Sequence, residues 1–198
     1  MATGALFKNS AVRIVSIIGL NDIMFDRYAG DNNTTLNPDQ KVYLMDDGET
    51  LCLPATNILS LLTAQNTESA PKRLMDKRKY KDFANACRSF VMIDPDQIPF
   101  IRDGKPIKMS TMDGDKDPIS GVYIHRSVAR LEKGIPNPKV RPVLPAPWKL
   151  TFTLTILDDT QVNEDQLRNL IDKAGLAIGL GTYRGRYGKY RVEQWDRI

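Results

Sequence analysis

Residues 149–195 read KLTFTLTILDDTQVNEDQLRNLIDKAGLAIGLGTYRGRYGKYRVEQW, and this stretch decides the fold. In 149–157 apolar residues alternate with threonines, which predicts a half-buried strand. Asn163 is a good N-cap, and apolar residues then recur at helical spacing until Gly175, where we expect the helix to stop. A glycine-rich loop leads into a last strand at 189–195. Strand, helix, glycine-rich loop and strand form half of a ferredoxin-like fold.

The N-terminal half supplies matching elements. Residues 11–18 are rich in β-branched side chains and predict a strand. We expect a second strand at 41–45 to form a hairpin with 51–53 across an Asp-Asp-Gly turn. Pro54 then opens a helix, and a further helical pattern runs over 80–90.

The middle of the chain is different in character. Residues 94–120 are rich in Pro, Gly and Asp and show no sustained periodicity, which predicts a loop-rich segment. Residues 121–131 alternate again, and a turn at 134–138 followed by a return strand from Lys139 would complete a basic ribbon. The predicted fold class is therefore α+β: a ferredoxin-like antiparallel sheet with helices on one face, plus a loop-rich insertion and a basic β-ribbon.

Length and composition fit one domain over residues 1–198, with a core at about 11–65 and 140–198 and an insertion at about 66–139. The net charge of +4 is a mild basic excess. The chain shows neither a signal-peptide pattern nor an apolar stretch of the ~18 residues that span a bilayer. We expect a soluble, cytoplasmic protein with no membrane partner.

The glycine-rich loop holds the clearest candidate site. Tyrosines and cations alternate there, so that rings can stack on bases while cations attract phosphates. The candidates are Tyr183, Arg184, Arg186, Tyr187 and Lys189. The plainer interpretation is a tight connection whose tyrosines pack on the core. A dinucleotide-binding role is disfavoured, because the glycine spacing is wrong and the loop follows a helix and precedes a strand.

Two further segments concentrate positive charge. The first is a run between the predicted helices and includes Lys72, Arg73, Lys77, Arg78, Lys79 and Lys81. The second is the predicted ribbon, with His125, Arg126, Arg130, Lys133, Lys139 and Arg141. Either segment would contact phosphates or would be an ordinary solvated surface, a helix end in the first case and a charged hairpin in the second.

Candidates for chemistry are sparse. His125 is the one histidine, and it shares no ligand-type spacing with Cys52 or Cys87, so we expect free thiols and neither a metal centre nor another cofactor. Asp113, Asp115 and Asp117 alternate as in a calcium loop. The glycine and distal glutamate of that loop are missing, and we expect a solvent-exposed turn. Asp22 and Asp26 follow the first strand, where a loop is favoured over a metal site.

The C-terminal end resembles a known signature. Residues 174–181, then Arg184, then residues 187–190 resemble the glycine-rich C-terminal motif of the RAMP superfamily. These are ferredoxin-like, RNA-binding proteins of CRISPR surveillance complexes. Residues 140–148 look like members from phages and mobile elements, and Leu53-Pro54-Ala55 matches the position of a similar turn in backbone-type subunits.

The resemblance implies a function. Backbone subunits of this superfamily stack along a guide RNA, grip its phosphates and insert a protruding ribbon between bases. It implies that Arg184, Arg186 and Lys189 line the path of the strand and that 125–141 is the ribbon. Single-stranded RNA or DNA would be the partner, and the chain would form a homo-oligomer or join a ribonucleoprotein complex, without catalysis.

Two other functions stay open. The first is a phage-borne protein-interaction module that mimics or blocks a host CRISPR complex. The second is a metal-dependent RNA nuclease, because some members of the superfamily cleave the paired target with an acidic residue after the first strand. Asp22, Asp26 and Asp31 would be the candidates here.

Overall fold

The computed structural model describes residues 9–63, 69–130 and 134–198, without the side chain of Arg130. Within these ranges, no helix is both long enough and apolar enough to cross a membrane. The predicted ribbon residue Lys133 lies outside the described residues.

An antiparallel sheet carries the fold. It contains β1 (Ala11–Gly19), β4 (Val91–Asp94), β10 (Lys149–Ile156) and β11 (Tyr190–Arg197). β1 pairs with β10 along its length and with β11 on its other edge, and β4 pairs with the free edge of β10. The resulting order, β11-β1-β10-β4, is that of a ferredoxin-like sheet.

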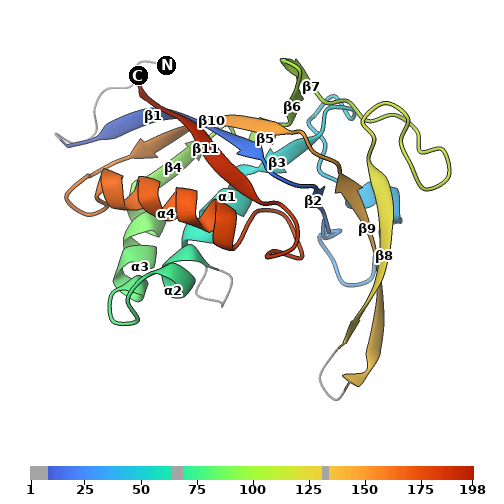
Figure 1. Ribbon diagram of the computed structural model, residues 1–198, viewed down its shortest axis with the longest axis horizontal. Helices are drawn as coiled ribbons and strands as arrows, with labels where there is room; N and C mark the ends of the chain where they lie inside the picture. Colours follow the sequence, from blue (N-terminus) through green and yellow to red (C-terminus); the bar gives the residue numbers. More distant parts are fainter. Residues whose placement is uncertain (1–8, 64–68, 131–133) are drawn as a thin grey trace.

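Helices cover one face of this sheet (Figure 1). They are α1 (Ala55–Thr63), α2 (Ala70–Leu74), α3 (Tyr80–Phe90) and α4 (Glu164–Ala177). Alternation along β10 turns Leu150, Phe152, Leu154 and Ile156 into the core. The amphipathic pattern of α4 supplies the opposing apolar face. The predicted fold class, α+β with helices on one face of an antiparallel sheet, is confirmed.

One helix boundary was predicted wrongly. Asn163 does cap α4, and its side chain accepts a hydrogen bond from the backbone of Gln166. The helix does not stop at Gly175, however, and continues to Ala177. A Cβ at Gly175 would overlap the backbone carbonyl and ring of Tyr190. Glycine stands here because α4 crosses β11 at close range.

The predicted hairpin of 41–45 with 51–53 forms in a short version. The N–H of Met45 donates to the carbonyl of Thr50 at 2.8 Å, and the N–H of Cys52 donates to the carbonyl of Tyr43 at 3.0 Å. A 3-10 helix, η1 (Pro38–Lys41), precedes this region, and the two segments share an isolated bridge between Leu44 and Leu51. β3 (Cys52–Pro54) also pairs with β5 (Gln97–Pro99). The hairpin is therefore short, β3 has a long-range partner as well, and α1 begins at Ala55, directly after Pro54.

The remaining elements, apart from β2, lie between β4 and β10 in the sequence. The short strands β6 (Ile101–Arg102) and β7 (Lys105–Pro106) form a hairpin at the edge of β10. The ribbon consists of β8 (Tyr123–Arg130) and β9 (Pro136–Leu144), and β2 (Ile23–Met24) pairs with its base. The ribbon projects away from the sheet and helices (Figure 1).

Two predicted boundaries change as a result. The return strand of the ribbon starts at Pro136 rather than Lys139. The predicted insertion at 66–139 begins too early, because α3 packs in the helical layer and β4 is a strand of the main sheet. These two elements belong to the core.

A buried carboxylate organises the inserted segment. Asp117 was expected in a solvent-exposed turn, but it is 0% exposed. It accepts hydrogen bonds from the hydroxyl of Ser110 at 2.5 Å and the backbone N–H of Ser120 at 3.0 Å. Burial by itself would raise the pKa of Asp117, yet these bonds outweigh burial and hold that pKa below its usual value.

Candidate nucleic-acid interface

The glycine-rich loop, residues 178–189, packs backbone against backbone. Gly188 has a φ of +71°, and a Cβ there would overlap the carbonyl oxygen of Leu180. Gly181 has a φ of +74°, and a Cβ there would overlap the carbonyl oxygen of Met24 in β2. Glycine is required at both positions by conformation and by space. The loop is therefore fixed against β2.

Asn21 fastens the loop to the end of β1. Its side-chain amide donates to the carbonyl of Arg186 at 2.7 Å, and its side-chain oxygen accepts from the backbone N–H of Lys189 at 2.8 Å. The indole of Trp148 donates to the carbonyl of Asn21 at 2.8 Å. One residue therefore binds both sides of the loop and is itself held by the core.

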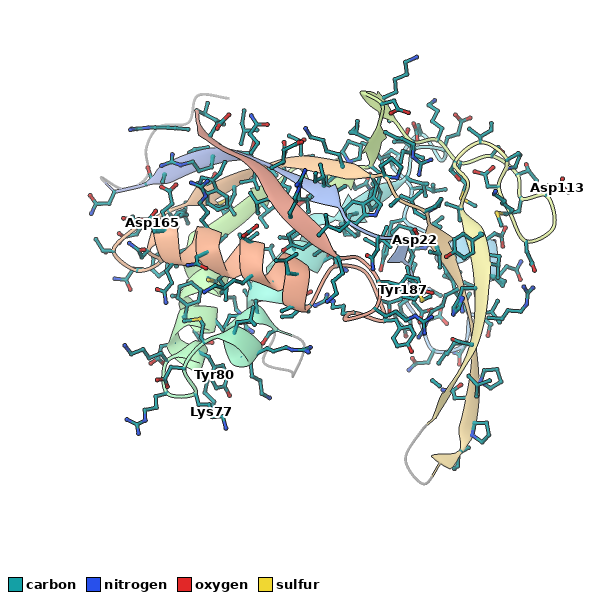
Figure 2. The ribbon with its side chains drawn as sticks, viewed as in Figure 1. Asp22, Lys77, Tyr80, Asp113, Asp165 and Tyr187 are labelled. Carbon is teal, nitrogen blue, oxygen red and sulfur yellow. The ribbon has the colours of Figure 1, made fainter. Side chains whose placement is uncertain are left out.

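Asp22, the next residue, fastens the ribbon. Its carboxylate accepts from the hydroxyl of Tyr123 in β8 at 2.9 Å and from the backbone N–H of Ala146 at 3.1 Å. Burial, and then the hydrogen bond to Asp22, raise the pKa of Tyr123. Asn21 and Asp22 thus form a staple between loop and ribbon, and Figure 2 shows Asp22 and Tyr187 close to the ribbon base.

The staple brings an aromatic row together, formed by Tyr183 and Tyr187 of the loop and His125 of the ribbon. The Tyr183 and Tyr187 ring centroids are 5.9 Å apart, and those of Tyr187 and His125 are also 5.9 Å apart. The guanidinium of Arg186 lies 5.9 Å from the Tyr187 ring centroid. Tyr187 is buried, whereas Tyr183 is 48% exposed. Four of the predicted residues therefore meet at one surface.

Other predicted cations are engaged elsewhere. Arg184 donates to the carbonyl of Gly181 at 3.2 Å and to the hydroxyl of Ser60 in α1 at 3.3 Å, so its guanidinium is directed towards the helical layer. Arg126 forms an ion pair with Asp115. Arg141 forms one with Asp26 at 2.7 Å. These contacts reduce the charge that the ribbon offers to phosphates.

The basic run lies on a different part of the molecule. Lys72 and Arg73 are in α2, and Lys77, Arg78 and Lys79 form the exposed turn before α3. Lys77 and Tyr80 lie at the far end of the helical layer, away from Tyr187 (Figure 2). The structure does not bring these cations together with the aromatic row.

The carboxylates considered for cleavage have protein partners. Asp22 holds the ribbon, and Asp26 pairs with Arg141 and, at 3.7 Å, with Lys41. Asp31 accepts hydrogen bonds from the backbone of Asn33 and Thr34 in an exposed turn. Among the residues described, no group of three or more His, Cys, Asp or Glu is placed to hold a metal ion.

Sequence reasoning missed Asn21 entirely and assigned Asp22 to a loop. An Asn-Asp pair after a strand is an ordinary turn signal, and nothing in its neighbours indicates contacts more than a hundred residues away. The indole of Trp148 and the amide of Asn57, which accepts from the backbone N–H of Gly181 at 3.1 Å, were missed for the same reason.

Comparison with known proteins supports the architecture. No protein-family model matches the chain, and no curated protein matches it. A chain in the cryo-EM structure of the type III-B Cmr-beta bound to cognate target RNA matches with a TM-score of 0.54 at 10% sequence identity. The match covers 96% of this chain and 61% of that chain, so this protein spans about three fifths of its neighbour's length. The fold of this protein is similar to that of a subunit of a CRISPR complex.

Proposed function

We propose that this protein is an RNA-binding subunit of a CRISPR-type ribonucleoprotein. It holds single-stranded RNA on the surface where the glycine-rich loop meets the ribbon, and it assembles along the strand with further subunits. The observation that carries this proposal is the convergence of Arg186, Tyr183, Tyr187 and His125, from two distant segments, at one surface.

The chemistry of that surface suits a single strand. Arg186 is exposed and available to a phosphate, and Tyr183, whose ring lies against that of Tyr187, is exposed and available to a base. At Gly185 nothing lies within 4 Å of where a Cβ would stand, so no side chain keeps a strand from the backbone there. The ribbon adds His125 and Lys139 along one side of the same surface.

The fold similarity supports the setting, because the neighbouring structure is a CRISPR complex bound to target RNA. Identity of 10% carries no individual residue over. We further propose that the protein acts without chemistry of its own. Asp22, Asp26 and Asp31, the carboxylates considered for the alternative of RNA cleavage, are all engaged by donors of the protein.

A binding titration with a matched charge reversal tests the proposal. Labelled single-stranded RNA is titrated with the wild type, R186E and K173E over a salt series. Arg186 and Lys173 are both exposed, and Lys173 lies on α4 outside the surface. We expect R186E to weaken binding roughly tenfold and to lower the salt slope by about one, and K173E to stay within about twofold.

Two results would overturn the proposal. One is a wild type that binds no RNA even at low salt, which would direct attention to a protein partner. The other is an equal loss of affinity in R186E and K173E, because it would mean that binding follows net charge and has no preferred surface.

A further inference from the structure

Tyr183 has a strained backbone. Its φ is +52°, in the left-handed region that side-chain-bearing residues rarely adopt. In the described part of the chain, the other non-glycine residue with positive φ is Asp103, in the β6–β7 turn. Aspartate tolerates that region through local hydrogen bonds, whereas tyrosine has no such compensation. Glycine would fit here without strain, and the chain carries a large aromatic residue instead.

The surrounding loop imposes this conformation. The carbonyl of Tyr183 accepts from the backbone N–H groups of Arg186 and Tyr187 at 3.4 and 3.3 Å. The preceding residue, Thr182, donates its N–H to the carbonyl of Met24 at 2.9 Å. Backbone strain that surrounding hydrogen bonds hold in place in this way is typical of ligand-binding positions.

Packing of the Tyr183 side chain in the core does not account for the strained backbone of this residue. Tyr190, a core tyrosine, is 1% exposed and donates its hydroxyl to the carbonyl of Ile171. Residue Tyr183 is 48% exposed, and within the described residues its hydroxyl makes no hydrogen bond. Its one ring contact there is with Tyr187, which is buried beside Met24 and Val143. Tyr183 is thus an exposed residue whose ring lies against the buried ring of Tyr187.

We propose that the ring of Tyr183 is a stacking platform for one unpaired base. The inference rests on the proposed function and specifies its ligand as a single strand with accessible bases. In a duplex each base is covered by its neighbours and its partner, so a flat ring at the surface finds no free base face. Arg186, three residues on, is placed to contact the phosphate of the stacked nucleotide.

The test separates stacking from a structural role. Asparagine tolerates positive φ, so Y183N relieves the strain and removes the ring. We expect its thermal unfolding midpoint to equal or exceed that of the wild type, while its affinity for a single-stranded RNA 12-mer falls roughly tenfold. Y183W keeps an aromatic ring and should retain affinity to within about threefold. A structural tyrosine would give the opposite pattern, with a lowered midpoint in Y183N.

Three probes define the ligand: the single-stranded 12-mer, an abasic strand of the same length, and a blunt duplex. The wild type should bind the 12-mer roughly tenfold more tightly than the abasic strand, and Y183N should bind the two equally. Equal affinity of wild type and Y183N for the 12-mer would overturn the proposal that Tyr183 stacks on a base. It would not contradict the proposal that the protein binds RNA. Equal wild-type affinity for the 12-mer and the abasic strand would do the same. A wild type that binds none of the probes would overturn both proposals.

Discussion

The loop–ribbon surface and the turn between α2 and α3 carry the same sequence signal but differ in structure. Both are dense in cations. At the loop–ribbon surface, Arg186 lies over a ring, and the backbone around it is held by Asn21 and by glycine contacts. In the α2–α3 turn, Lys77, Arg78 and Lys79 are exposed on a short connection. Cation density predicts where anions are attracted, whereas a fixed backbone with aromatic neighbours predicts where one strand is held.

The largest expected effect comes from removing the rigidity of the loop. G188A places a Cβ against the carbonyl of Leu180 at a φ of +71°. We expect a loss of about 3 kcal/mol in the free energy of unfolding, measured with urea, because both overlap and strain must be relieved. The matched control is G185A, where φ is +93° but a Cβ meets nothing within 4 Å. It should cost about 1 kcal/mol. Equal losses would show that close packing of the loop does not matter.

Cutting the staple should have the next largest effect. D22A leaves the Tyr123 hydroxyl and the Ala146 N–H without their acceptor. We expect a loss of about 2 kcal/mol in unfolding free energy and faster amide hydrogen exchange in β8 and β9. D31A, which removes a carboxylate from an exposed turn, should leave the free energy of unfolding nearly unchanged. Unchanged exchange in the ribbon of D22A would contradict the assignment of Asp22 as its anchor.

A contrast between local patterns and long-range packing explains which parts of the fold the sequence could predict. Alternation in β10, the capped amphipathic pattern of α4 and the β-branched run of β1 are local signals, and each element formed where expected except at the end of α4. Gly175 is inside α4 because Tyr190, fifteen residues on, crosses it. That fact depends on packing, which a glycine alone does not reveal.

The candidate site likewise has features that local sequence indicates and features that depend on long-range packing. The alternating tyrosines and cations of the loop pointed to Tyr183, Arg186 and Tyr187, and the structure places these three side by side, with the Tyr187 ring buried. The direction of Arg184 towards Ser60 was not predictable, because it follows from how the loop packs on α1. Nor was the pairing of Arg126 with Asp115, since composition counts charges without showing which are neutralised.

Acid pH should loosen the ribbon side before the α2–α3 turn. The folded-state pKa of Asp117 is lowered, so its contribution to stability is present above its unfolded pKa of about 3.9 and is lost as pH falls through the lower folded value. Its neighbour Ser120 accepts from the N–H of Val122, at the start of the ribbon. We expect unfolding free energy to drop by about 1 kcal/mol below pH 4, with a flatter profile in D117N. Identical pH profiles would contradict this role.

The smallest effect is expected from the second cationic region, and it tests the comparison most directly. K77A/R78A/K79A removes three exposed charges, and its affinity for single-stranded RNA should fall about twofold at 0.05 M salt, because those cations attract the strand without fixing it. At 0.3 M salt the difference should vanish, since the screening length is then below about 8 Å. R186A removes one charge but should keep a loss of about fivefold at both salt concentrations, because the guanidinium acts through contact beside Tyr187. A triple variant that loses more affinity than R186A at high salt would reverse the assignment and place the strand on the helical layer.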